Sequence, residues 1–350
     1  MRTILFTGGG SAGHVIPNLA LFPKLAPSFR LVYAGTDAIE HRLIPDCGIP
    51  FYCFSAPKLV RGKFLENLTL PFRLLKSVRN AKQILNEVRP DLVFSKGGYV
   101  ALPVVFAARA MKIPVLTHES DYSPGLANKL IAKRCRTVLT SFPETARRVK
   151  NGTFSGAPIR ENLFAATKTA GLQKYGFTGE KPVLLVFGGG SGSAAINRAV
   201  ENCLCRLLKS FAILHIRGKN APPPQYDGYV PLEFESDMAS AYACSDFVLS
   251  RAGSNTVFEI LALKKPSLLV PLENGRTRGD QIENALYFEK RGLCRVLRER
   301  DLSPERLFTE LTALRNDPDL PARLAHAPFK AGNDAICREI LNALSESPRP

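Results

Sequence analysis

The chain lacks any hydrophobic run approaching the roughly 18 consecutive residues that a membrane-spanning helix requires. The apolar segment at residues 1–7 runs directly into a glycine cluster. It is too short for a signal-peptide core, and no small-residue cleavage site follows it. We therefore expect a cytoplasmic protein that does not cross a membrane.

Paired cysteines and clustered metal ligands are also missing. The sequence has eight cysteines but no Cys-x-x-Cys pair, and only Cys203 and Cys205 are close together. We interpret them as buried free thiols. The tripeptide Asp317-Pro318-Asp319 follows an expected helix, far from any glycine loop, and is typical of a turn. We expect no metal ion and no bound cofactor.

Acidic residues are few relative to basic ones, 31 against 47, which gives a net charge of +16. Such an excess indicates an anionic partner: nucleic acid, an acidic membrane surface or a phosphorylated substrate. No zinc finger, basic zipper or aromatic-basic RNA-binding motif is present, so we expect no nucleic acid. A basic surface that only maintains solubility is the remaining alternative.

A chain of 350 residues is long enough for two domains, and its two halves begin alike. Residues 2–13 pass from a β-rich segment into a glycine loop, followed by a helix from about Pro17. Residues 181–193 do the same, followed by an amphipathic stretch at 194–208. Strand, glycine loop and helix are the opening of a doubly wound α/β domain.

Short continuous apolar runs, typical of parallel strands covered on both faces, alternate with expected helices. They lie at 31–34, 92–95, 114–117 and 137–140 in the first half, and at 212–216, 247–250 and 267–270 in the second. Apolar residues at helical spacing from Leu74 to Val88 predict a helix with a core stripe. A break in the pattern near residues 156–162 predicts domains at 1–158 and 159–330. A last helix within 331–350 is expected to return to the first domain.

Each glycine loop that opens a helix presents backbone N–H groups at the positive end of the helix dipole, which suits an anion. Gly8-x-Gly10-x-x-Gly13 matches the dinucleotide pattern, and Asp37 follows the second strand, where a ribose-binding acid lies in NAD enzymes. A dehydrogenase is therefore one alternative, and glycines that serve only helix packing are another. Two such loops favour two phosphorylated ligands.

Five ordered motifs make the sequence more specific. They are Gly-Gly-Ser-Ala-Gly-His-Val-Ile-Pro at 9–17, Ser-Lys-Gly-Gly-Tyr-Val at 95–100, His-Glu-Ser-Asp at 118–121 with Pro-Gly-Leu-Ala-Asn-Lys at 124–129, Ser-Arg-Ala-Gly-Ser-Asn-Thr-Val-Phe-Glu at 250–259, and Gly-Asp-Gln-Ile-Glu-Asn-Ala at 279–285. Together they resemble the MurG family, in glycosyltransferase family 28, which converts lipid I to lipid II in peptidoglycan synthesis.

The resemblance spans residues 1 to about 290 and implies a GT-B fold, two Rossmann-like doubly wound domains about a cleft. It implies inverting transfer of N-acetylglucosamine from UDP-GlcNAc to the muramoyl C4 hydroxyl of lipid I. Roles in cell wall biogenesis, cell shape and cell division would follow. Another GT-B glycosyltransferase, a UDP-sugar epimerase and a non-catalytic nucleotide-sugar-binding protein are the alternatives.

The resemblance also implies site residues. The donor-binding set is Ser11, Ala12, Gly13, Asp121, Arg160, Gly189, Gly190, Ser191, Glu235, Arg251, Ser254, Asn255, Thr256, Val257, Phe258, Glu259 and Gln281. Within it, loop 189–191 would hold the UDP phosphates, Glu259 would accept hydrogen bonds from ribose or sugar hydroxyls, and Gln281 would contact the sugar. The acceptor-diphosphate set is Gly9, Gly10, Tyr99 and Asn128. Arg251 and Arg160 would neutralise the donor diphosphate without a cation.

Inverting transfer needs a base for the acceptor hydroxyl and an electrophilic clamp for the leaving UDP. His14 is our first candidate base, because a helix start disfavours the imidazolium and keeps the ring neutral. Capping or diphosphate contact is the alternative role for His14. His118 and Glu119 are further candidates, with structural hydrogen bonding as their alternative.

Residues 58–82 combine basic and apolar side chains. They contain Lys58, Arg61, Lys63, Arg73, Lys76, Arg79 and Lys82 against the single acid Glu66, interleaved with Phe64, Leu65, Leu68, Leu70 and Phe72. This composition suits contact with an anionic membrane surface. We therefore expect a peripheral protein at the cytoplasmic side of the inner membrane. A solvated helix face is the alternative. Residues 74–88 are expected to be core, which leaves Phe64–Phe72 and the flanking basic residues as the segment that would contact the membrane.

Overall fold

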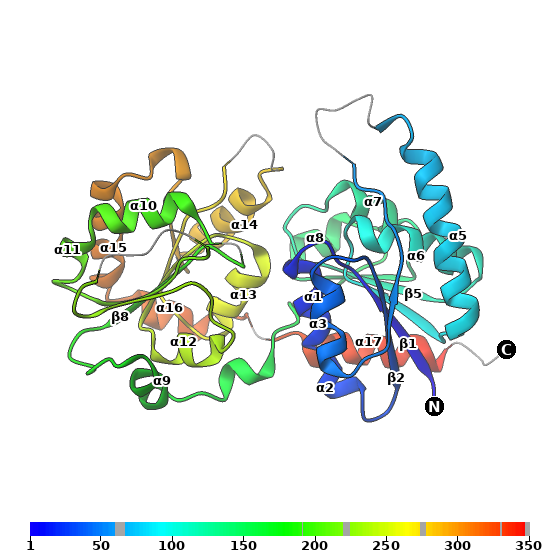
Figure 1. Ribbon diagram of the computed structural model, residues 1–350, viewed down its shortest axis with the longest axis horizontal. Coiled ribbons are helices and arrows are strands. Elements are labelled where there is room, and N and C mark those ends of the chain that lie inside the picture. The colour runs from blue at the N-terminus through cyan, green and yellow to red at the C-terminus, as the bar shows by residue number, and fades with distance from the viewer. Residues whose placement is uncertain (60–66, 191, 220–224, 274–277, 330, 347–350) are drawn as a thin grey trace. The chain divides into compact units, whose positions relative to one another are not determined.

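The computed structural model describes residues 1–59, 67–190, 192–219, 225–273, 278–329 and 331–346. It divides into two compact units. The N-terminal unit comprises Met1–Arg160 with Ala331–Pro350, and the C-terminal unit comprises Glu161–Lys330. Each unit is a parallel sheet packed with helices (Figure 1).

The N-terminal unit has a seven-stranded sheet in the order β3-β2-β1-β4-β5-β6-β7, with every neighbouring pair parallel. Its strands are β1 (Thr3–Thr7), β2 (Arg30–Gly35), β3 (Phe51–Cys53), β4 (Leu92–Ser95), β5 (Val115–Glu119), β6 (Thr137–Thr140) and β7 (Gly152–Phe154). The strand order reverses between β1 and β4. In sheets of this kind, ligands bind at the carboxyl ends of the strands beside the reversal.

Two apolar clusters cover the two faces of this sheet, because successive strand residues point to opposite sides. Ile4 and Phe6 lie in one cluster with α1, α2 and α17, and Leu5 lies in the other with α5 and α6. The unit's helices are α1 (Ala12–Leu19), α2 (Phe22–Leu25), α3 (Ile39–Leu43), α5 (Leu70–Val88), α6 (Gly98–Ala110), α7 (Leu126–Ala132), α8 (Pro143–Arg148) and α17 (Asn333–Ser345). The Asn333 side chain accepts from Ile159 N and donates to Ile159 O, which fixes the start of α17.

The C-terminal unit repeats the plan with six parallel strands in the order β10-β9-β8-β11-β12-β13. They are β8 (Val183–Phe187), β9 (Ala212–Ile216), β10 (Tyr229–Leu232), β11 (Phe247–Ser250), β12 (Ser267–Leu269) and β13 (Arg295–Val296). Its helices are α9 (Lys168–Tyr175), α10 (Ala194–Asn202), α11 (Leu204–Leu207), α12 (Met238–Cys244), α13 (Ser254–Ala262), α14 (Asp280–Glu289), α15 (Pro304–Arg315) and α16 (Leu320–His326). Here the strand order reverses between β8 and β11.

The doubly wound α/β fold and the nine strands expected from apolar runs are confirmed. The first helix was placed too late: Ser11 is extended, α1 begins at Ala12, and Pro17 lies inside it. The stretch at 194–208 is not one helix, because Cys203 leaves helical geometry at φ −120° and ψ 14° and separates α10 from α11.

Burial and turn geometry decide three further expectations, on the cysteines, the α5 core stripe and the turn at 317–319. Cys47, Cys53 and Cys205 are exposed, so the interpretation of all cysteines as buried thiols was wrong for these three. Leu75 is 52% exposed, so the core stripe of α5 begins later than expected, at Ser77. The turn at 317–319 is confirmed by the Asp317 carboxylate, which accepts the Asp319 N–H at 3.1 Å. In the described part of the chain, no helix is long and apolar enough to cross a membrane.

Candidate active site

The first glycine loop follows β1 and rests on a buried carboxylate. Glu40, with no exposed surface, accepts the Gly10 N–H at 2.9 Å and the Thr36 hydroxyl at 2.6 Å. A Cβ atom at Gly9 would lie 2.1 Å from Glu40 Oε1, and one at Gly10 would lie 2.6 Å from the Tyr99 ring. Glycine is therefore required at both positions. The sequence motifs do not include Glu40.

His14 lies in the first turn of α1 with one ring nitrogen anchored. Its Nδ1 is 3.2 Å from the backbone carbonyl of Lys96. A carbonyl only accepts, so Nδ1 carries the proton of the neutral ring and Nε2 holds the lone pair. Burial lowers the pKa of His14, and the Lys96 ammonium lowers it further. His14 is thus a neutral imidazole whose Nε2 is able to take a proton.

Three charged side chains follow β4 and β5 beside His14. Lys96 is 2% exposed and donates from Nζ to the Ser120 hydroxyl. Burial lowers the pKa of Lys96 to about 8. Burial, followed by the nearby Asp121 carboxylate, raises the pKa of Glu119 to about 7. These buried titratable groups make this edge of the sheet a candidate for proton transfer.

Asn128, on α7, joins two of the motifs. Its Oδ1 accepts the Gly98 N–H at 2.8 Å, and its Nδ2 donates to Glu119 at 2.7 Å. A Cβ at Gly97 would lie 2.3 Å from Asn128 Oδ1. The structure therefore brings the motifs at 9–17, 95–100, 118–121 and 124–129 to one end of the sheet. Ser11 and Gly13 are exposed and Ala12 half-buried at the start of α1.

His118 occupies a different position from the other candidates. Its ring is fully buried, its Nε2 lies 2.9 Å from the Gly156 carbonyl, and burial lowers its pKa well below the usual range. A fully buried ring that holds a backbone carbonyl does not reach a substrate hydroxyl. The structure therefore favours the structural role for His118 and leaves His14 and Glu119 as the candidate bases.

The second glycine loop, after β8, combines packed and open positions. A Cβ at Gly188 would lie 2.4 Å from Ser193 N, and one at Gly192 would lie 2.1 Å from Arg217 O. At Gly189 and Gly190 a Cβ would meet no atom within 4 Å. The open pair leaves backbone accessible to a ligand, as a phosphate loop requires. Ser191 lies outside the described residues.

The N-terminus of α13 lies beside this loop's strand, because β11 pairs with β8. Gly253 precedes the helix and provides no side-chain cap, and a Cβ there would meet no atom within 4 Å. Helix geometry leaves the first N–H groups, those of Ser254, Asn255 and Thr256, unused within the helix. Val257 and Phe258 are buried in the core, and the Val257 N–H donates to the Gly253 carbonyl at 3.0 Å, so neither side chain is exposed to a bound nucleotide sugar.

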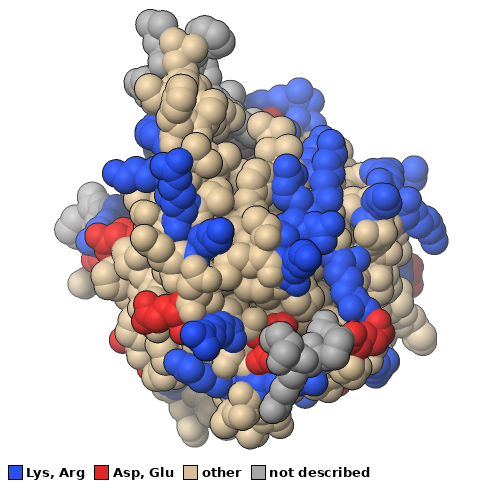
Figure 2. Space-filling view, turned by 90° about the vertical axis from the view of Figure 1, so that its right-hand side faces the viewer, with Lys and Arg blue, Asp and Glu red and all other residues tan. Residues whose placement is uncertain are grey.

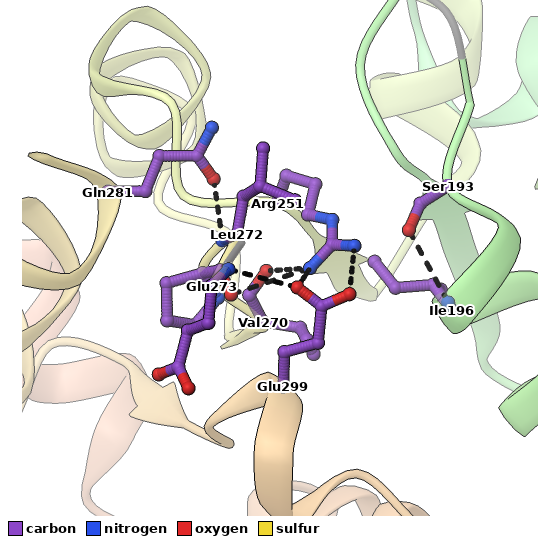
Figure 3. A network of polar contacts seen from close by, with 9 residues as sticks. Ser193, Ile196, Arg251, Val270, Leu272, Glu273, Gln281 and Glu299 are labelled. Carbon is purple, nitrogen blue, oxygen red and sulfur yellow. Dashed lines mark hydrogen bonds and ion pairs between the residues drawn. The ribbon is translucent and has the colours of Figure 1, made fainter. Parts of the chain in front are cut away.

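Arg251 is held within the C-terminal unit (Figure 3). Its guanidinium forms a bidentate ion pair with Glu299, at 2.9 and 3.0 Å, and donates to the Val270 carbonyl at 3.2 Å. Its charge is therefore compensated within the unit by Glu299.

The partners of Arg251 continue into the next loop. Glu299 also accepts the Glu273 N–H at 3.0 Å, and Gln281 accepts the Leu272 N–H at 3.0 Å (Figure 3). Arg251 and Gln281 therefore both fix the backbone that follows β12.

The remaining donor candidates differ in how their side chains are used. Glu259 is half-buried on α13 and accepts from the Tyr242 hydroxyl at 3.3 Å. The Glu235 carboxylate accepts a hydrogen bond from the Tyr175 hydroxyl at 2.7 Å. Because the side chain is engaged in this way, the Glu235 backbone is the part that would contact the uracil base. Arg160 is half-buried at the end of the N-terminal unit's main segment.

The comparisons with known proteins agree on one family. Models of the glycosyltransferase family 28 N-terminal and C-terminal domains match residues 4–140 and 183–339. The crystal structure of Acinetobacter baumannii MurG has a TM-score of 0.76 at 26% identity and covers 98% of this chain and 100% of its own. The chain belongs to the MurG family, within glycosyltransferase family 28.

A MurG-family relative from Clostridium kluyveri is 45% identical over 322 residues, 90% of this chain and 91% of its own. It is named UDP-N-acetylglucosamine--N-acetylmuramyl-(pentapeptide) pyrophosphoryl-undecaprenol N-acetylglucosamine transferase. The calicheamicin glycosyltransferase CalG4 shares the fold, with a TM-score of 0.73 at 16% identity and full coverage of both chains. Membership of the MurG family confirms the GT-B fold and the enzyme class, and it excludes the oxidoreductase alternative.

Proposed function

We propose that the protein transfers N-acetylglucosamine from UDP-GlcNAc to the muramoyl C4 hydroxyl of lipid I, with inversion, and so forms lipid II for peptidoglycan synthesis. The observation that carries this proposal is the 45% identity, over 90% of the chain, to a transferase of that name. The neutral ring of His14 beside the first glycine loop supports it independently.

The C-terminal unit would bind the donor. The open backbone at Gly189 and Gly190 and the first N–H groups of α13 offer hydrogen-bond donors to the UDP diphosphate. Glu259 would accept from ribose or sugar hydroxyls, and Gln281 would contact the sugar from the segment that Arg251 fixes. Backbone dipoles then stabilise the charge that develops on the leaving UDP.

The N-terminal unit would bind the acceptor and remove its proton. Gly9, Gly10, Tyr99 and Asn128 lie around the loop that would hold the acceptor diphosphate. The C4 oxygen attacks the anomeric carbon, the bond from that carbon to the UDP oxygen breaks, and the hydroxyl proton passes to His14 Nε2. Glu119, with a pKa of about 7, is the second candidate for this proton.

Membrane contact is the second part of the proposal. Leu68, Phe72 and Leu75 are 55%, 77% and 52% exposed at the start of α5, and Phe72 and Leu75 share one side of the helix. The same helix exposes the basic residues Arg73, Lys76, Arg79 and Lys82. Figure 2, which views the side where α5 lies in Figure 1, shows more Lys and Arg than Asp and Glu.

This combination suits an anionic lipid surface, with attraction of about 1 kcal/mol per basic residue. It would place the enzyme peripherally at the cytoplasmic face of the inner membrane, where lipid I is held. Of the expected apolar residues, Phe64 and Leu65 lie outside the described part of the chain. Flotation with anionic vesicles, compared with neutral ones, tests this contact, and Phe72→Ser should weaken it.

Radiolabel transfer from UDP-GlcNAc to a lipid I analogue tests the proposed activity. We expect label in the lipid product with UDP-GlcNAc and much less with UDP-glucose. Conversion of UDP-GlcNAc without acceptor would indicate an epimerase instead. Tight UDP-GlcNAc binding with no transfer would leave a nucleotide-sugar-binding protein and overturn the proposal.

A further inference from the structure

Lys96 makes one contact through its backbone carbonyl and another through its side-chain ammonium. Its backbone continues β4 alongside β1, since its N–H donates to the Thr7 carbonyl at 2.8 Å. Its own carbonyl accepts a hydrogen bond from His14 Nδ1. Its side chain runs inward, 2% exposed, and ends at the Ser120 hydroxyl. One residue therefore anchors the candidate base and buries an ammonium beside it.

Charged groups face this ammonium from three elements. Glu119 ends β5 and Asp121 follows it; both carboxylates favour the charged form of Lys96. His14 on α1 and His118 on β5 both have their pKa lowered by the Lys96 charge. Toward His14, the opposing carboxylates are Asp121 and, on α3, Glu40.

Packing alone does not account for this lysine. A buried ammonium costs free energy that an apolar side chain of similar length would avoid. Among the described residues, the hydrogen-bond partner of the ammonium is Ser120, which lies outside the first glycine loop. What it changes is the charge around His14 and Glu119.

We propose that Lys96 is a positioning residue for the transfer reaction: its carbonyl selects the His14 tautomer with a bare Nε2, and its ammonium favours the unprotonated form of that nitrogen and the ionised form of Glu119. This inference rests on the proposed function. It assigns Lys96 an electrostatic role exerted through His14, with no contact to substrate.

The direct test is a titration of the histidine rings by NMR, which needs no activity. The chain has five histidines, so comparison with His14→Gln assigns the His14 signal. Lys96→Met removes the charge at nearly constant volume, and we expect His14 to titrate at higher pH than in the wild type. Asp121→Asn removes the opposing charge, and we expect His14 to titrate at lower pH.

The pH dependence of kcat/KM should shift in the same direction as the His14 pKa. A base works when unprotonated, so raising its pKa moves the acid limb of kcat/KM to higher pH. Lys96→Met should therefore lose at least about threefold more activity at pH 6 than at pH 8, the effect of half a pH unit. Asp121→Asn should move the acid limb the opposite way. The double variant should lie between the two, and Lys96→Arg, which keeps the charge, should resemble the wild type.

The outcomes separate the two claims. If the wild-type protein transfers no sugar, the proposed function fails while the NMR titration still tests Lys96. An unchanged His14 titration in both Lys96→Met and Asp121→Asn would overturn the electrostatic role. A loss of activity equal at every pH would overturn it too, because that is the signature of a purely structural residue. If Lys96→Met does not fold, Lys96→Gln, which also removes the charge but keeps a hydrogen-bond donor for Ser120, carries the same test.

Discussion

The backbone carbonyl of Lys96 accepts a hydrogen bond from His14 Nδ1–H, with 3.2 Å between nitrogen and oxygen. This contact determines which nitrogen of the ring is basic. The contact joins the residue after β4 to the start of α1, the helix that follows β1, so it lies at the strand-order reversal between β1 and β4. A general base needs a fixed tautomer and a neutral resting state. His14 has both because of its neighbours.

Replacing His14 should slow transfer without weakening donor binding. We expect His14→Ala to lower kcat by about 10²- to 10⁴-fold, the usual contribution of a positioned base. UDP affinity, which the proposed function assigns mainly to the C-terminal unit, should stay at the wild-type value. Steady-state kinetics and calorimetry measure the two quantities. A nearly normal kcat would move the base role to Glu119.

The first glycine loop offers a matched pair of substitutions. In Gly9→Ala the new Cβ would meet Glu40, whose carboxylate is held by Gly10 and Thr36 and has no room to move. In Gly48→Ala the Cβ would meet nothing, and only the left-handed backbone at φ 69° is strained, at about 1 kcal/mol.

We therefore expect Gly9→Ala to lose transfer activity and Gly48→Ala to keep it while unfolding at slightly lower temperature. Kinetics and thermal unfolding of both variants check this. Equal activities would show that Glu40 does not shape the loop.

Substitutions at two glycines of the second glycine loop should affect UDP binding and protein stability separately. In Gly190→Ala the added methyl enters open space, so folding should be unaffected while UDP binds at least about tenfold more weakly, a cost of 1.4 kcal/mol. In Gly188→Ala the Cβ would lie 2.4 Å from Ser193 N, so stability should fall. Calorimetry and thermal unfolding distinguish the two. Wild-type UDP affinity in Gly190→Ala would remove the loop from the donor site.

The Arg251–Glu299 ion pair should stabilise the C-terminal unit only as a pair. Arg251→Met leaves Glu299 without its partner in a poorly hydrated place, and we expect a loss of about 3 kcal/mol in the free energy of unfolding. The double variant Arg251→Met with Glu299→Met should lose less, because no charge is left unpaired. Denaturant unfolding tests this, and additive losses would contradict it.

Protein stability should fall in acid partly because of His215. The ring is fully buried between the Tyr229 hydroxyl and Asn197 Oδ1, each at 3.0 Å. Burial, followed by the Arg217 charge, lowers its pKa from 6.5 to about 3. Between these values only the unfolded chain takes up the proton, so stability present above pH 6.5 is lost as the pH falls toward 3.

We expect the unfolding temperature to drop by several degrees from pH 7.5 to pH 5, and to drop less in His215→Gln. His14 and His118, whose pKa values are also lowered, act with the same sign in the N-terminal unit. An equal drop in wild type and variant would show that His215 does not contribute.

The interior of both sheets was predictable because buried parallel strands are continuous apolar runs. Four strands were missed: β3, β7, β10 and β13. All four are edge strands, and most of their residues are half-buried or exposed, so they lack that signal. The turn residues around these four strands did not provide a substitute signal.

In the candidate site, too, some residues were predictable from the sequence and others were not. Motifs located the glycine loops, His14, Glu119 and Asn128, since their residues lie close together in sequence. The partners that position them were not predictable. Glu40 meets its loop across 30 residues and Glu299 meets Arg251 across 48, and only folding brings such pairs together. Charge compensation of Arg251 could not be anticipated from its motif.

Product analysis with ¹³C-labelled UDP-GlcNAc and a lipid I analogue tests the central claim, direct inverting transfer to the muramoyl C4 hydroxyl. Because the donor sugar is α-linked and one displacement inverts it, NMR should show a β-linked disaccharide formed in equal amount to released UDP. An α-linked product, attachment at another hydroxyl, or UDP release without glycosylated lipid would contradict the account.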